Sequence, residues 1–278
     1  MFMKVLIVLL YIFVLPVILI AQNVGQKGDT LINYKDINGM KQGHWQKKYE
    51  NETIAYDAYF KNDKIVGDYK RYYSNGKLKA YVKYDNKGNQ TGYAILYWDN
   101  GNVMAEGKYI NLNVKDSIWT FYGTDGKLVS KISYNKGVKD GDEINYYRNG
   151  KMSELIQYKD DKKDGLWQRF NENGDVYFET GYKNGIRNGG INIYYPNGKL
   201  RIKGRYVNGL KHGKFVFYDE KGEIEKEIVY KKGKAENEDE INSDYAKEIL
   251  EFEKNKYRYP EPDESDFFKN NPKIQEEH

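Results

Sequence analysis

The amino-acid sequence predicts an all-β fold: an elongated antiparallel meander of about eight repeated β-hairpins, followed by a short C-terminal helix. Three observations support this prediction. Tyrosine recurs every 24 or 25 residues from Tyr84 to Tyr230, and each of these tyrosines follows a turn-like glycine by eight residues. Apolar and polar residues alternate between the glycine and the tyrosine, as they do in β-strands. A period of this length indicates one supersecondary unit copied along the chain.

The first 21 residues predict a secretory signal peptide. Lys4 is the only charged side chain in this stretch, and an apolar run from Val5 to Ala21 follows it. A positive start, an apolar stretch and a small residue at its end are typical of such a signal. We expect cleavage after Ala21 and a periplasmic or secreted protein. The alternative is an uncleaved segment that anchors the protein in the membrane, although Pro16 would kink a spanning helix.

Residues 22–42 are expected to form a lead-in, and residues 43–234 the array of repeated hairpins. Asn-Gly or Asp-Gly stands in the middle of most copies, which predicts a two-residue type I′ turn. A looser turn, such as Lys183-Asn184-Gly185, is expected to close each copy. Glu52 stands in the turn of the first copy, as is typical of a terminal cap. The predicted turn glycines are Gly76, Gly101, Gly126, Gly150, Gly174 and Gly198.

The second strand of each copy is expected to have one covered face and one wet face. In residues 199–206, Leu200 and Ile202 alternate with Arg201 and Lys203. A tyrosine ring can pack against its cross-strand neighbours while its hydroxyl stays in water. We therefore predict a ladder of Tyr84, Tyr109, Tyr134, Tyr158, Tyr182, Tyr206 and Tyr230, and a packing role for Trp45, Trp119 and Trp167, which share one repeat position.

The last 44 residues differ from the repeats in charge. Residues 235–278 contain 14 acidic and six basic side chains, whereas the whole chain has a net charge of +4. We expect an acidic linker, a short helix over Asp244–Lys254 and a disordered tail. Ile241, Tyr245, Ile249 and Phe252 would share one face of that helix. The helix is expected to cover the last open strand; the alternative is that it binds a partner.

The residues predict no catalytic site, no metal site and no cofactor. The chain has three histidines and no cysteine, and no serine stands in a nucleophile motif. No nucleic-acid-binding motif occurs, so no nucleic-acid partner is expected. The candidate surface contacts are Trp98, next to the aromatic column, and four cations on the polar side of one strand: Lys199, Arg201, Lys203 and Arg205.

The repeated pattern G-x-W-x-x-Y-[YF]-x-N-G-K-[LM], closed by Y-x-N-G, resembles the MORN repeat variant. It occurs at Gly67–Leu78, Gly141–Met152 and Gly189–Leu200. Ala94, Glu143 and Ile191 stand where the family has Trp or Tyr, and Ser117 replaces an opening glycine. The resemblance extends to bacterial YwqK-type proteins, which carry an antitoxin label. It implies an array of β-hairpins used for contact with proteins or membrane surfaces.

These observations together predict a non-catalytic, exported repeat scaffold that mediates protein–protein interaction at the cell envelope. Stacked repeats form extended surfaces, which favours binding. The partner protein is unknown. Two alternatives stay open: a peripheral module that binds a membrane surface or glycan through its Lys/Arg-rich face, and an antitoxin-like neutraliser of a partner toxin.

Overall fold

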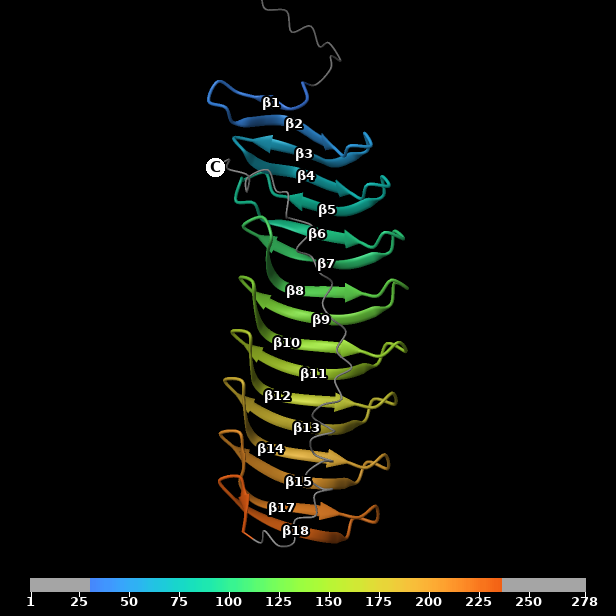
Figure 1. Cartoon of the computed structure of the whole chain (residues 1–278), viewed down its shortest axis with the longest axis vertical. Coiled ribbons are helices and arrows are strands. Elements are labelled where there is room, and N and C mark those ends of the chain that lie inside the picture. The colour runs from blue at the N-terminus through green and yellow to red at the C-terminus, as the bar shows by residue number, and fades with distance from the viewer. Residues whose placement is uncertain (1–30, 237–278) are drawn as a thin grey trace, which may run out of the picture. The chain divides into compact units, whose positions relative to one another are not determined.

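The computed structural model describes residues 31–236, which form one antiparallel sheet of 19 strands (Figure 1). Each strand pairs with the next one in the chain, except that β15 pairs both with the two-residue β16 and with β17. The predicted meander of hairpins is therefore confirmed. The predicted signal peptide and the predicted helix over Asp244–Lys254 lie outside the described residues.

The strands have the following bounds: β1 Tyr34–Lys35, β2 Lys41–Lys48, β3 Ile54–Lys61, β4 Lys64–Tyr72, β5 Leu78–Tyr84, β6 Gly92–Tyr97, β7 Val103–Ile110, β8 Val114–Tyr122, β9 Leu128–Asn135, β10 Val138–Tyr146, β11 Met152–Lys159, β12 Lys162–Phe170, β13 Val176–Lys183, β14 Ile186–Tyr194, β15 Leu200–Val207, β16 Leu210–Lys211, β17 Gly213–Tyr218, β18 Ile224–Lys231 and β19 Lys234–Ala235. Within residues 31–236, no helix is long and apolar enough to cross a membrane.

The Asn-Gly turns are three-residue loops. Between β4 and β5, the Gly76 amide donates to the Tyr73 carbonyl at 2.9 Å, and the Tyr73 amide donates to the Lys77 carbonyl at 2.8 Å. The strand register shifts next to this turn, between Arg71 and Tyr72. A type I turn followed by a left-handed glycine has this geometry. The six predicted turn glycines all have φ between +76° and +97°.

The predicted type I′ turn is therefore wrong for the Asn-Gly sites, and positive φ at two successive residues occurs instead at the other end of most hairpins. A type I′ turn needs positive φ at both central residues, but only Gly76 of its pair has it. The Asn75 side chain accepts a hydrogen bond from the Lys77 amide at 3.0 Å, which stabilises the right-handed turn instead. Between β13 and β14, Asn184 and Gly185 have φ of +49° and +80°. The connections predicted to be looser thus include tight two-residue turns.

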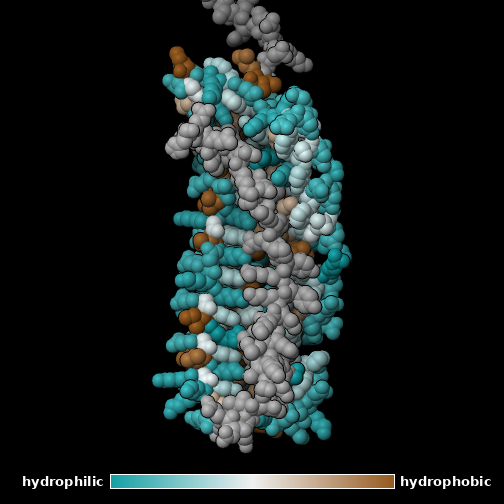
Figure 2. Space-filling model, viewed as in Figure 1, coloured by the Kyte–Doolittle hydropathy of each residue, from teal (hydrophilic) through white to brown (hydrophobic). Residues whose placement is uncertain are grey.

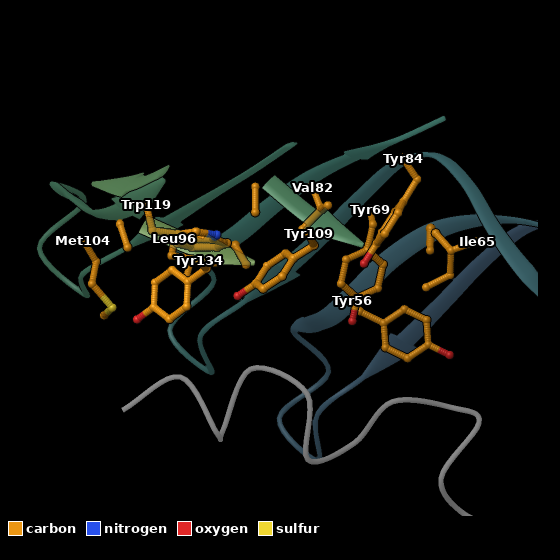
Figure 3. Close-up of a cluster of buried hydrophobic side chains, with 14 of the residues drawn as sticks. Tyr56, Ile65, Tyr69, Val82, Tyr84, Leu96, Met104, Tyr109, Trp119 and Tyr134 are labelled. Atoms are coloured by element: carbon orange, nitrogen blue, oxygen red, sulfur yellow. The ribbon is translucent and has the colours of Figure 1, made fainter. Parts of the chain in front are cut away.

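The hydrophobic core lies on one face of the sheet, which we call the core face; the opposite face is the open face. Two clusters of buried side chains form the core, one from Tyr56 to Tyr134 and one from Ile156 to Ala235. Figure 3 shows tyrosines of the first cluster together with Leu96 and Trp119. On the surface in view in Figure 2, hydrophobic residues stand in small groups among hydrophilic ones. The alternation predicted for residues 199–206 is confirmed, because Ile202 is buried and Lys203 exposed.

Glycine makes room for large rings on the core face. A Cβ at Gly204, in β15, would overlap the ring of Phe215 on the neighbouring β17. Gly190 lies opposite Arg205 in the same sheet, yet a Cβ there would have no neighbour closer than 4.0 Å. A methyl group would therefore clash at Gly204 on the core face but not at Gly190 on the open face.

We expect Gly204→Ala to lower the free energy of unfolding by about 1–3 kcal/mol, because the added methyl overpacks the core. Gly190→Ala is the matched control and should leave the stability within about 0.5 kcal/mol. Urea unfolding followed by circular dichroism measures both. Equal stability of the two variants would contradict the packing described for Phe215.

Candidate functional site

The predicted tyrosine ladder lies on the core face. Six of its seven members are buried and Tyr182 is half-buried. The Tyr69 and Tyr84 rings are 6.3 Å apart, and Phe215 lies between Tyr206 and Tyr230 at 5.8 and 5.1 Å. The expectation of a wet hydroxyl is wrong for Tyr84, whose hydroxyl donates to the Leu112 carbonyl at 2.8 Å. This tyrosine is buried, so its polar atom is paired within the protein.

The tryptophans of the shared repeat position also pack on the core face, as predicted. Trp119 and Trp167 are buried, and Trp45 packs against the first cluster. The Trp119 ring lies 4.6 Å from that of Tyr109, and its indole N–H donates to the Lys108 carbonyl at 3.0 Å. These residues therefore stabilise the fold.

A row of cations, which sequence reasoning missed, lies over the rings of the core face. Each member stands two residues before the opening residue of a repeat. The Lys163 ammonium is 3.9 Å from the centre of the Trp167 ring, and the Arg187 guanidinium is 4.6 Å from that of Tyr206. Cations at such distances are attracted to the ring face. We call this set the cation row; its members are Lys41, Lys115, Lys139, Lys163, Arg187 and Lys211.

The cation row lies beside open space. A hollow of about 650 Å³ is lined by residues that include Lys115, Tyr134 and Lys139. Burial lowers the pKa of Lys41, the first member of the row. The row thus combines positive charge and aromatic surface along several consecutive repeats.

A buried polar cluster interrupts the apolar core between its two halves. One Glu154 oxygen accepts hydrogen bonds from the Trp167 indole at 2.7 Å and from Arg169 Nε at 3.2 Å; the other accepts from Asn145 at 3.0 Å. Glu143 is buried nearby and pairs with Lys139 at 2.9 Å. Buried charges are tolerated when they are paired in this way. The cluster therefore links the two halves of the core.

The open face carries a second aromatic column. Its members are half-buried and stand five residues after the opening residue of each repeat: Tyr72, Tyr97, Tyr122, Tyr146, Phe170, Tyr194 and Tyr218. More exposed apolar side chains lie on the same face, with Tyr59, Tyr93 and Ile118 at 48%, 51% and 60% exposure. The open face therefore presents aromatic surface to solvent along much of the described sheet.

Carboxylates on the open face are held by hydrogen bonds. Glu106 accepts from the Tyr93 hydroxyl at 3.1 Å and from the Tyr122 hydroxyl at 2.7 Å. Burial and the bond to Glu106 raise the pKa of Tyr122 to about 12. Burial alone would raise the pKa of Glu179, but hydrogen bonds from Asn192, Gln168 and Tyr194 lower it below its ordinary value. Hydrogen bonds therefore hold the carboxylates of Glu106 and Glu179 in fixed orientations.

The predicted contact residues lie in different surroundings. Trp98 is half-buried, and its indole N–H donates to the Tyr122 carbonyl of the next repeat at 3.1 Å. The Lys199 ammonium donates to the Lys221 carbonyl in the next turn at 2.8 Å. Arg201 lies over the Tyr195 ring at 5.2 Å. Lys203 and Arg205 are exposed on the open face. Trp98 and Lys199 thus connect successive repeats, and the contact role of all five stays a prediction.

The buried tyrosines should make the protein less stable at alkaline pH. Burial raises the pKa of Tyr69 from 10.0 to about 12. As the pH rises, the hydroxyl of Tyr69 therefore loses its proton in the unfolded chain before it does so in the folded protein. The contribution of the buried, protonated hydroxyl to stability is complete below pH 10 and is lost as the pH rises toward 12. Urea unfolding at a series of pH values measures this loss, and Tyr69→Phe should reduce it. Unchanged stability between pH 10 and 12 would contradict the burial of these hydroxyls.

Comparison with known families identifies the repeats. The MORN repeat variant family matches seven segments, at residues 65–86, 90–111, 115–136, 139–160, 163–184, 192–208 and 211–232. These segments follow one another from β4 to β18, and the atypical first hairpin of β2 and β3 precedes them.

Curated proteins give no significant match to the chain. Among residues 31–236, no three His, Asp or Glu side chains are grouped as metal ligands would be. MORN repeats generally form non-enzymatic modules that are often involved in protein or membrane interactions. Because the seven matches cover more than half of its residues, the chain belongs to the MORN repeat variant family.

Proposed function

We propose that the protein is a non-catalytic scaffold that is exported to the cell envelope and binds a partner protein on the open face of its sheet. The aromatic column from Tyr72 to Tyr218 is the observation that carries this proposal. Tyrosine is enriched where proteins bind one another, because its ring supplies apolar area and its hydroxyl a hydrogen bond. The column offers such a ring in seven consecutive hairpins, on a face that the core does not use.

The polar groups of the open face support protein binding as well. Glu106 and Glu179 are already oriented by tyrosine hydroxyls and amide groups. A partner that donates hydrogen bonds to them finds acceptors that need little reorganisation, which reduces the entropic cost of association. The chemistry of the face therefore suits a partner with exposed N–H donors and apolar side chains.

Export is supported by the charge and hydropathy pattern of residues 1–21. Mass spectrometry of the mature protein tests it. We expect a chain that begins at Gln22; an intact N-terminus at Met1 would contradict cleavage and favour the anchored form.

Site-specific photo-crosslinking in intact cells tests the proposed binding face. A photoreactive residue at Ile118, which is 60% exposed on the open face, should capture one reproducible partner. Ile186 is the matched control, because it is also an isoleucine, is 52% exposed, and stands next to a turn between β13 and β14. We expect the photoreactive residue at position 118 to capture the partner and the one at position 186 to capture little of it. Equal capture at both positions, or none at 118, would refute the proposed face.

An anionic membrane surface is the second candidate ligand. Lys203 and Arg205 lie exposed on the same face of β15, which is the arrangement that attracts anionic lipid headgroups. Co-sedimentation with phosphatidylglycerol vesicles, compared between the native chain and Lys203→Gln/Arg205→Gln, tests this. Vesicle binding that changes neither with salt nor with the two substitutions would exclude an anionic membrane surface as the ligand of Lys203 and Arg205. If the crosslinked partner is a toxin, the scaffold acts as an antitoxin-like neutraliser.

A further inference from the structure

We propose that the acidic C-terminal segment, residues 237–278, binds the core face of its own sheet along the cation row. The inference is independent of the partner proposed for the open face. It rests on the charge of the two surfaces, on their shared aromatic character and on the point where the segment leaves the sheet.

The cation row supplies a positive track with a regular spacing. One cation stands in each of the last five repeats, at Lys115, Lys139, Lys163, Arg187 and Lys211. Successive members are two strands apart, or about 10 Å at the usual strand spacing. Glu143, which pairs with Lys139, is the buried carboxylate beside this track. A chain with frequent acidic residues can match such a spacing.

The segment has the complementary composition. Residues 237–278 contain 13 acidic and six basic side chains. They also include six aromatic side chains, namely Tyr245, Phe252, Tyr257, Tyr259, Phe267 and Phe268. The acidic groups suit the cations of the row, and the aromatic groups suit the rings beneath them. The cations are half-buried and most rings beneath them are buried, so the charged contacts are the main ones.

The segment also starts beside the end of the row. Ala235 pairs with Tyr230, and the Lys211 ammonium lies 5.1 Å from the centre of the Tyr230 ring. From there to Lys115 the row crosses eight strand spacings, or about 40 Å. Forty-two extended residues can span up to about 140 Å. The segment can therefore reach every member of the row.

Charge distinguishes the two faces of the sheet as binding surfaces for this segment. The open face carries carboxylates at Asp57, Glu106, Glu179 and Glu227. These carboxylates stand among exposed cations such as Lys83, Lys131 and Lys203, whereas the cations of the row follow one another over aromatic rings. The segment thus favours the core face and leaves the open face to other ligands.

A cleavable form of the mature protein tests the proposal. A protease site inserted between Glu236 and Asn237 leaves the chain intact until it is cut. After cleavage, we expect the segment to co-elute with the folded sheet at low ionic strength and to separate in 1 M salt, where the screening length falls to about 3 Å. Circular dichroism checks that the sheet stays folded. A segment that separates from the folded sheet at low ionic strength would overturn the proposal.

Paired variants locate the binding face. Lys115→Gln/Lys163→Gln/Lys211→Gln should weaken retention of the segment by about tenfold or more. Lys83→Gln/Lys131→Gln/Lys203→Gln removes the same charge from exposed positions outside the row and should leave retention nearly unchanged.

If the row variant does not fold, glutamine at Glu248, Glu251 and Glu253 of the segment provides the same test without altering the sheet. Equal release by the row variant and its control, or retention that the three glutamine substitutions in the segment leave unchanged, would show that the cation row does not hold it.

Discussion

Trp119→Ala should lower the free energy of unfolding by about 3–5 kcal/mol, as expected for removal of a large buried aromatic side chain. Trp119 is completely buried, and its ring packs between those of Tyr109 and Phe121 at 4.6 and 6.2 Å. Gly107 on the neighbouring strand leaves room for the Trp119 ring, since a Cβ there would lie 2.5 Å from the indole. Denaturant unfolding measures the loss of stability when it is followed by circular dichroism of the backbone, a signal that does not depend on the removed tryptophan.

Ile118→Ala is the matched control for this variant. Ile118 precedes Trp119 in β8 but points to the open face and is 60% exposed. Its truncation should change the stability by less than about 0.5 kcal/mol. If both substitutions destabilise the protein equally, the assignment of the two faces is wrong.

Glu154→Leu should destabilise the protein by about 3–5 kcal/mol, because it leaves the buried charge of Arg169 without its carboxylate. Side-chain exposures of 11% for Glu154 and 4% for Arg169 place this pair in the core. The substitution also removes the acceptor of the Trp167 indole and of Asn145. Thermal and urea unfolding both report the effect.

Glu227→Leu removes a carboxylate from an exposed pair and serves as the control. Glu227 pairs with Lys214 at 2.8 Å, with side-chain exposures of 37% and 56%. Such a pair contributes at most about 1 kcal/mol. The double variant Glu154→Leu/Arg169→Leu should recover part of the lost stability, since apolar residues can replace a buried ion pair. If the added Arg169→Leu substitution recovers no stability, the unpaired charge of Arg169 is not the cause of the destabilisation in Glu154→Leu.

Much of the fold could be predicted because each repeat carries its own local signals. Gly76 and its equivalents mark the turns, and the alternation that ends at Tyr84 identifies the covered face. The turn type was predicted wrongly because Asn-Gly is compatible with two loops. The choice depended on the Asn75 side chain, whose hydrogen bond to the Lys77 amide cannot be read from the dipeptide.

The two faces were harder to predict. The lysines of the cation row resemble ordinary polar residues near a turn, and only the fold shows that Lys163 extends over the Trp167 ring. Their 24-residue spacing was the available signal. Glu143 is a departure from the repeat that the sequence shows, but its position opposite Ile156 depends on pairing between β10 and β11. Cross-strand register of this kind is decided by the whole sheet.

Oxidative footprinting of Ile118 and Trp119 in the native chain, with and without the partner that crosslinking identifies, tests most directly whether one face holds the fold while the other binds. These neighbours in β8 belong to opposite faces, with exposures of 60% and 0%. We predict that Ile118 is labelled in the free protein and protected in the complex, and that Trp119 is unlabelled in both. Labelling of Trp119 in the free protein, or an Ile118 that stays labelled in the complex, would contradict the separation of the two faces.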